Sequence, residues 1–173
     1  MSYPGSSGGA NYLKGFNNVM SNLNMELEKI KGKSEKGLVM AAAFIRKQTE
    51  TADPKTPVDL GNLRHSWAVV SSTRVYAGNT RSAFVGPKGG DIGTNHGQVL
   101  TQFQALAQGL SNGNQRKVVV LGYSVNYGGY VHEMIGDITW TRKGSNSHWL
   151  ETHIKRNQKK LLQIIATEVK IRK

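Results

Sequence analysis

The stretch of residues 56–67, which reads TPVDLGNLRHSW, constrains the fold more than any other part of this chain. Pro57 cannot continue a helix, and it biases the residue before it toward extended geometry. Gly61 accepts a left-handed or tight backbone at little cost, and Asp59 and Asn62 can hydrogen-bond to their own backbone. We therefore predict a rigid corner here, with a helix before it and a strand after it.

Two helices are predicted before the corner. In residues 12–30 the apolar side chains recur at helical spacing, namely at Tyr12, Phe16, Val19, Met20, Leu23, Leu27 and Ile30. The run KGKS at 31–34 is predicted to break this helix, and Ser34 is placed to cap a second one. Gly37 is predicted to be a weak point of the second helix. The apolar side of that helix consists of Leu38, Ala41, Ala42 and Ile45.

Four segments after the corner have the β-branched or aromatic character of strands: residues 63–72, 75–77, 82–85 and 117–125. Residues 87–116 are interpreted as a loop insertion containing a short helix, 98–110. A last helix of about 22 residues is predicted over 148–169. The predicted fold class is therefore α+β, with an antiparallel sheet of about four strands packed against two or three helices.

Size and composition favour a single domain over residues 11–173, preceded by a flexible Gly- and Ser-rich arm over residues 1–10. The hydrophobic content of 38% is low for a compact globule, and it indicates a subunit that depends on interfaces. The chain has no cysteine, which excludes disulfides and thiolate metal sites. No signal peptide and no membrane-spanning apolar run are recognised.

Positive charge is concentrated near the C-terminus. The net charge is +12, and residues 141–173 contribute nine basic and two acidic side chains. Such a one-sided field favours a polyanion or an acidic protein surface as partner, although a solvated helix face also has this composition. The candidate residues facing DNA or a partner are Lys155, Arg156, Lys159, Lys160 and Lys170.

Motifs for catalysis are weak. His132-Glu133 begins like a zincin helix but lacks the second histidine at the required offset, and it is interpreted as the end of a strand. His148 and His153 are five residues apart, which places them on different helical faces as surface or capping residues. Asp91, Glu133 and Asp137 form a carboxylate trio of a kind that arises by chance. We therefore expect no enzyme activity, no metal site and no cofactor.

Three motifs follow one another along the chain. The first is PVDLGNLRHS at 57–66, the second is VNYGGYVHE at 125–133, and the third is the helix 148–169. Their order resembles that of a family of tailed-bacteriophage neck proteins, the tail-completion or head–tail joining type. The sequence departs from that family's pattern at Leu60, where Thr is usual, and at Met134, where Gly is usual.

The resemblance implies a structural virion protein that forms a homo-oligomeric ring, a hexamer or dodecamer, joining the DNA-filled head to the tail. The implied neighbours are a head-closure or connector protein, tail terminator or tail tube proteins, and double-stranded DNA in the lumen. The implied location is the virion neck, with assembly in the host cytoplasm. A soluble, basic nucleic-acid-binding module is the alternative, although exposed aromatics for base stacking are not interleaved with the basic residues.

Roles follow for individual residues. The motif residues Pro57, Val58, Asp59, Gly61, Leu63, Arg64 and Ser66 are assigned a structural role. Leu63 and Trp67 are predicted to lie in the core, and Arg64 to bond nearby backbone or Glu133. Glu133 is alternatively a member of an ion pair between subunits. The candidate inter-subunit residues are Tyr127, Tyr130 and Glu133.

Overall fold

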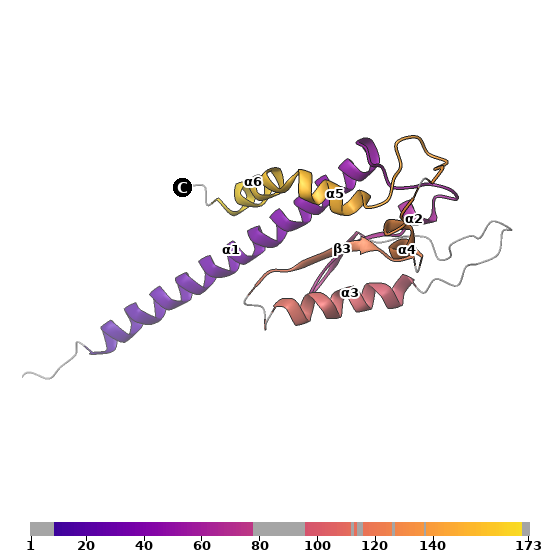
Figure 1. The fold of residues 1–173 in the computed structure, drawn as a ribbon. Helices are drawn as coiled ribbons and strands as arrows, with labels where there is room; N and C mark the ends of the chain where they lie inside the picture. Colours follow the sequence, from indigo (N-terminus) through magenta and orange to yellow (C-terminus); the bar gives the residue numbers. More distant parts are fainter. Residues whose placement is uncertain are drawn as a thin grey trace, which may run out of the picture.

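The computed structural model describes residues 9–77, 96–111, 113, 116–125, 127–136 and 138–170. These residues form an α+β fold, as predicted, with a three-stranded antiparallel sheet and six helices (Figure 1). The strands, in the spatial order β2-β1-β3, are β1 (Trp67–Ser71), β2 (Val75–Ala77) and β3 (Val119–Tyr123). The helices are α1 (Gly9–Thr51), α2 (Asn62–His65), α3 (His96–Ser111), α4 (Gly128–His132), α5 (Trp149–Arg156) and α6 (Gln158–Val169).

The described residues contain three strands, whereas about four were predicted. One of the four predicted strands, residues 82–85, lies outside the described residues. Most of the first half of the predicted insertion lies outside them as well. Residues 1–8 of the predicted flexible arm also lie outside them, whereas Gly9 and Ala10 already belong to α1. The helix predicted within the insertion is confirmed as α3.

Helix α1 is one continuous helix of 43 residues, so the predicted break at 31–34 is wrong. A glycine inside a helix costs only about 1 kcal/mol relative to alanine, which is too little to interrupt a long helical pattern. Gly37 is not a weak point but a point of close approach, because a Cβ there would lie 3.0 Å from Ile165 Cα of α6. The N-terminal part of α1 extends beyond the rest of the fold (Figure 1).

The central strand β1 is buried along its whole length. Its register with β3 pairs Trp67 with Tyr123. Because alternate strand residues face opposite sides, Trp67 and Val69 share the face that packs on α1 and α5. Helix α3 covers the other face (Figure 1). There Phe103 comes so close to β3 that a Cβ at Gly122 would lie 3.1 Å from its ring.

Two segments predicted as strand are helical. Residues 62–65 form α2, so β1 begins at Trp67 rather than at residue 63. Residues 128–132 form α4, so His132 does not end a strand. The backbone N–H of Ser124 donates to Ser66 O at 2.9 Å, just beyond the β1–β3 ladder. On the far side of this bond both segments of the chain form short helices, and α2 and α4 lie side by side (Figure 1).

The predicted C-terminal helix is present but divided into α5 and α6 at Asn157. The Asn157 side-chain amide donates to His153 O at 2.9 Å, which satisfies the carbonyl at the end of α5. The residue preceding α5 is His148, and its φ is +52°. Trp149 is fully buried, whereas Leu162 is 67% exposed.

Candidate functional site

The corner predicted at residues 56–67 is a buried joint. Thr56 is fully buried, and its N–H donates to Thr49 O of α1 at 2.8 Å. Gly61 has a φ of +80°, the left-handed geometry that glycine accepts most easily. Leu63 is buried against Val125 and Trp149, and with Trp67 it confirms the two core predictions.

The other motif residues lie on both sides of this joint. Pro57 is buried, Val58 is half-buried and Asp59 is exposed at the surface. Ser66 is fully buried, and its hydroxyl donates to Leu63 O at 2.8 Å. The motif therefore contributes mainly to the inside of the corner, and the geometry fits a structural role for most of its residues.

Arg64 does not contact Glu133, and the predicted pairing with Glu133 is wrong. Its Nε lies 2.6 Å from Oε2 of Glu50, at the end of α1. Arg46 Nη1 and Arg142 Nη1 lie 3.0 and 3.1 Å from the same carboxylate, whose side chain is only 16% exposed. We call these four residues the Glu50 cluster. Of the three contacts with the carboxylate, only that from Arg142 also has hydrogen-bond geometry.

The arginines of the Glu50 cluster also hold backbone carbonyls. Arg142 donates to Glu50 O at 2.6 Å and to Thr56 O at 3.1 Å. Arg46 donates to Arg64 O at 2.6 Å, and its guanidinium lies 5.5 Å from the ring centre of Trp67. Charged donors to carbonyls are among the stronger hydrogen bonds. The cluster therefore joins α1, the corner and the loop before α5, and sequence reasoning missed Glu50 because no motif contains it.

The predicted basic residues fall into two groups. Lys155 forms an ion pair with Glu151 one turn earlier, and Arg156 donates to Asp53 O at 2.7 Å. Lys159, Lys160 and Lys170 are exposed, and no acidic partner for them lies among the described residues. Within the described residues, the second group has no ion pair to break before it meets an anionic partner.

The three candidate inter-subunit residues differ in how far their side chains are exposed. Tyr127 is half-buried against the Leu63 side of the core; burial raises the pKa of its phenol, and the nearby Asp59 charge raises it further. Tyr130 is 74% exposed on α4. Ile135, which sequence reasoning did not single out, is 93% exposed just after α4. Tyr130 and Ile135 are thus two exposed apolar side chains on and just after α4, and we call them the exposed apolar pair.

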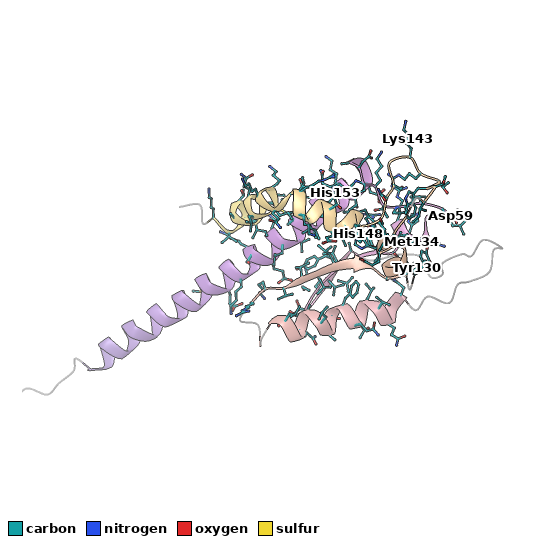
Figure 2. The ribbon with its side chains drawn as sticks, in the orientation of Figure 1. Asp59, Tyr130, Met134, Lys143, His148 and His153 are labelled. Atoms are coloured by element: carbon teal, nitrogen blue, oxygen red, sulfur yellow. The ribbon has the colours of Figure 1, made fainter. Side chains whose placement is uncertain are left out.

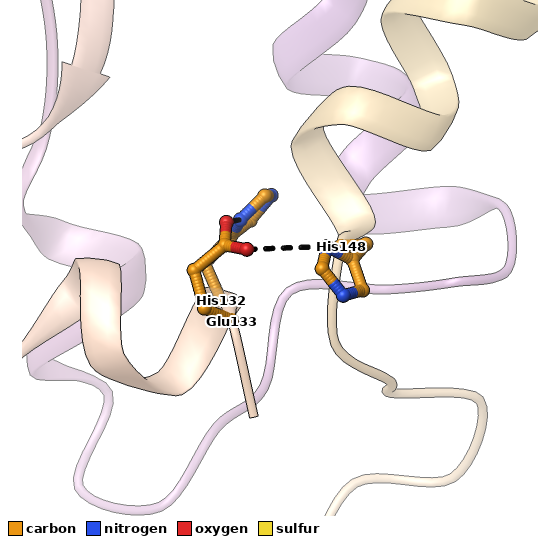
Figure 3. Close-up of side chains that lie close together, drawn as sticks. All are labelled: His132, Glu133 and His148. Carbon is orange, nitrogen blue, oxygen red and sulfur yellow. Dashed lines mark hydrogen bonds and ion pairs between the residues drawn. The ribbon is translucent and has the colours of Figure 1, made fainter. Parts of the chain in front are cut away.

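Glu133 lies between two histidines that the sequence analysis treated separately. Its Oε1 is 2.6 Å from His132 Nδ1, and its Oε2 is 3.7 Å from His148 Nδ1 (Figure 3). We call these three residues the His132 cluster. His153, predicted at the surface or as a cap, is instead buried, with Nε2 3.0 Å from Pro54 O. Asp91 and Asp137 of the carboxylate trio lie outside the described residues.

Comparison with known proteins finds no matching protein family, no curated relative and no solved structure similar to this chain. Among the helices that the structure describes, none combines the length and apolar character needed to cross a bilayer.

Proposed function

We propose that this chain is a structural subunit of the neck of a tailed bacteriophage. Copies of it form a ring that joins the DNA-filled head to the tail and lets the genome pass. The observation that carries the proposal is the motif at residues 57–66, whose order and spacing resemble the neck family. Its Pro57, Gly61, Leu63 and Ser66 serve a buried corner, which is the role that a structural protein requires of them.

The shape of the chain supports assembly into a ring. Head-to-tail contacts close a ring when each subunit has two complementary lateral faces and the rotation closes. Helix α1 extends past the sheet at one end of the fold, and α4, with Tyr130, lies toward the other end (Figures 1 and 2). The exposed pair of Tyr130 and Ile135 gives that second end an apolar surface suited to a neighbouring copy.

Charge supports passage of DNA. Lys159, Lys160 and Lys170 are exposed on or just after α6. Attraction between lysines and phosphates is independent of base sequence and weakens with salt. A few such contacts suit a conduit, since they attract the duplex without holding it at one position.

A soluble nucleic-acid-binding module is the second candidate, and these same unpaired lysines favour it. The two functions differ in what the protein assembles into. A module of this kind binds DNA as a monomer, tightly and with strong salt dependence. A neck subunit becomes part of a particle.

The deciding experiment locates the protein in tailed particles. Particles produced in cells that carry the gene are purified, analysed by mass spectrometry, and labelled with antibody for electron microscopy. We expect the label at the head–tail junction, with six or twelve copies of the chain in each particle. Absence from particles, together with salt-sensitive binding of DNA by the monomer, would favour the second candidate.

A surface variant tests the proposed lateral face. Ile135→Asp places a charge on the exposed apolar pair, and we expect it to abolish incorporation into particles while the isolated chain remains folded. Leu106→Asp, which alters a leucine that is 52% exposed on α3, is the matched control and is expected to be incorporated normally. Normal incorporation of Ile135→Asp would remove this face from the proposal.

A further inference from the structure

The His132 cluster brings together three metal-ligating side chains from two segments. His132 and Glu133 stand at the end of α4, and His148 directly precedes α5. One ligand atom from each residue lies within 4.8 Å of the others (Figure 3). Two imidazoles and a carboxylate are a ligand set that zinc accepts in proteins.

The two segments are held in place by contacts that do not involve the ligand atoms. The backbone N–H of His148 donates to His132 O at 2.8 Å. The His132 ring lies edge-on against the fully buried Trp149, with 4.8 Å between ring centres. The cluster is therefore positioned by the fold before any ion binds, which lowers the cost of ordering its side chains.

Two nitrogens of the cluster lack hydrogen-bond partners. His132 Nε2 and His148 Nδ1 are both buried atoms, and neither is hydrogen-bonded to any group in the described part of the chain. Of these two, His148 Nδ1 is a ligand atom of the cluster, and it lies 3.7 Å from carboxylate oxygens of both Glu133 and Glu151, whereas His132 faces Glu133 with its other ring nitrogen, Nδ1. His148 also adopts a φ of +52°, which is uncommon for a residue other than glycine. Buried nitrogens without hydrogen bonds and an uncommon backbone geometry are costly, and such features gather at binding sites.

From this geometry we propose that His132, Glu133 and His148 bind a zinc ion. Bonds of about 2.0–2.1 Å to a tetrahedral ion place the ligand atoms roughly 3.3 Å apart. The separations of 2.6 Å from His132 Nδ1 to Glu133 Oε1 and of 3.7 Å from His148 Nδ1 to Glu133 Oε2 lie on either side of that value. Imidazole ligands favour zinc over magnesium or calcium, which prefer oxygen. This proposal departs from our sequence-based expectation of no metal site.

The exposure of the His132 cluster fits a zinc ion that binds and dissociates reversibly. The side chains of Glu133 and His148 are 66% and 41% exposed, so an ion enters from solvent and water completes its coordination. The bound ion ties the end of α4 to the start of α5. It therefore fixes the segment that begins at Glu133 and carries the exposed Ile135. The proposal does not depend on the neck function, because a site of this kind stabilises the fold in any context.

The experiment uses the full chain without a histidine tag. Native mass spectrometry and titration calorimetry with zinc chloride are expected to give one ion per chain. His148→Ala and Glu133→Gln each remove one ligand from the exposed side, and we expect each to weaken zinc binding at least about tenfold. His65→Ala, which removes an exposed histidine outside the cluster, is the matched control and is expected to bind as the parent chain does.

Cobalt gives a readout that does not depend on any biological activity. Replacing zinc by Co²⁺ is expected to give the visible absorption of a tetrahedral ion, and His148→Ala is expected to lose it while its circular dichroism stays unchanged. The proposal is overturned if the folded chain binds no zinc. It is equally overturned if His148→Ala and Glu133→Gln bind zinc as tightly as the parent chain.

Discussion

The Glu50 cluster and the His132 cluster both join segments far apart in the sequence, but they differ in how their polar groups are satisfied. In the Glu50 cluster one mostly buried carboxylate meets three guanidinium groups, and these also hold backbone carbonyls. In the His132 cluster the carboxylate is mostly exposed, and two buried nitrogens remain without a hydrogen bond. The first arrangement balances its buried charge with three opposite charges and holds the fold together, and the atoms in it that lack hydrogen bonds, Glu50 Oε1, Arg46 Nη1 and Arg64 Nε, all belong to these ion pairs. The second has capacity left for a ligand.

The largest effect is expected from a charge inside the corner. Leu63→Asp buries a carboxylate against Val125 and Trp149, and we expect a loss of more than about 4 kcal/mol, enough to prevent folding. Soluble expression and urea denaturation measure it. The control Leu60→Asp alters a leucine that is 46% exposed, and it is expected to change stability by less than about 0.5 kcal/mol. A stable Leu63→Asp chain would mean that the corner is not part of the core.

The next largest effect is expected in the Glu50 cluster. Glu50→Gln leaves Arg46, Arg64 and Arg142 without their shared counter-charge, and we expect a loss of about 3 kcal/mol in the free energy of unfolding. Chemical denaturation measures it. Glu151→Gln removes an exposed ion pair on α5 and is expected to cost less than about 1 kcal/mol. Equal losses in the two variants would contradict the structural role given to the cluster.

Substitutions at two glycines, one in the corner and one on α4, are expected to change stability in opposite directions. Gly61→Ala forces alanine into a φ of +80°, and we expect a loss of about 1 kcal/mol. Gly129→Ala places a methyl group in open space on α4, with nothing within 4 Å of the added Cβ. We expect that change to stabilise the chain by about 0.5 kcal/mol, because alanine favours helix. Thermal denaturation of both variants measures these changes in stability. Changes of the same sign in the two variants would contradict this prediction.

The smallest effect on stability is expected at the exposed lysines. Replacing Lys159 and Lys160 together by Gln is expected to change the free energy of unfolding by less than about 0.5 kcal/mol. If both lysines contact phosphate, the slope of log affinity for DNA against log salt falls by about 1.8. Fluorescence anisotropy at several salt concentrations measures this slope. An unchanged slope would show that α6 does not face the duplex.

Local patterns in the sequence were enough to predict much of the fold. Pro57 and Gly61 require a corner whatever surrounds them, because their backbone preferences are intrinsic. The β-branched and aromatic character of residues 63–72 likewise predicted a strand, and a short helix was predicted over 98–110, from neighbouring residues alone. The class of fold followed from these elements.

Other features depended on contacts that no local pattern contains. Gly37 looked like a point of weakness, yet in the fold it lets α6 approach α1 closely. Arg64 was predicted to bond nearby backbone or Glu133, whereas Glu50 reaches it from the end of α1. In each case the deciding group is remote in sequence, so its effect arises only once the chain has packed.

The two clusters show the same division. The sequence by itself determined that a corner exists, that its leucine and tryptophan are buried, and that the C-terminal part is basic, because these follow from residue type and spacing. Only the tertiary structure decided that Glu50 would gather three arginines, and that His132 and His148, sixteen residues apart, would share one carboxylate. Backbone preferences act over a few residues, whereas charge and metal-ligand geometry act through space.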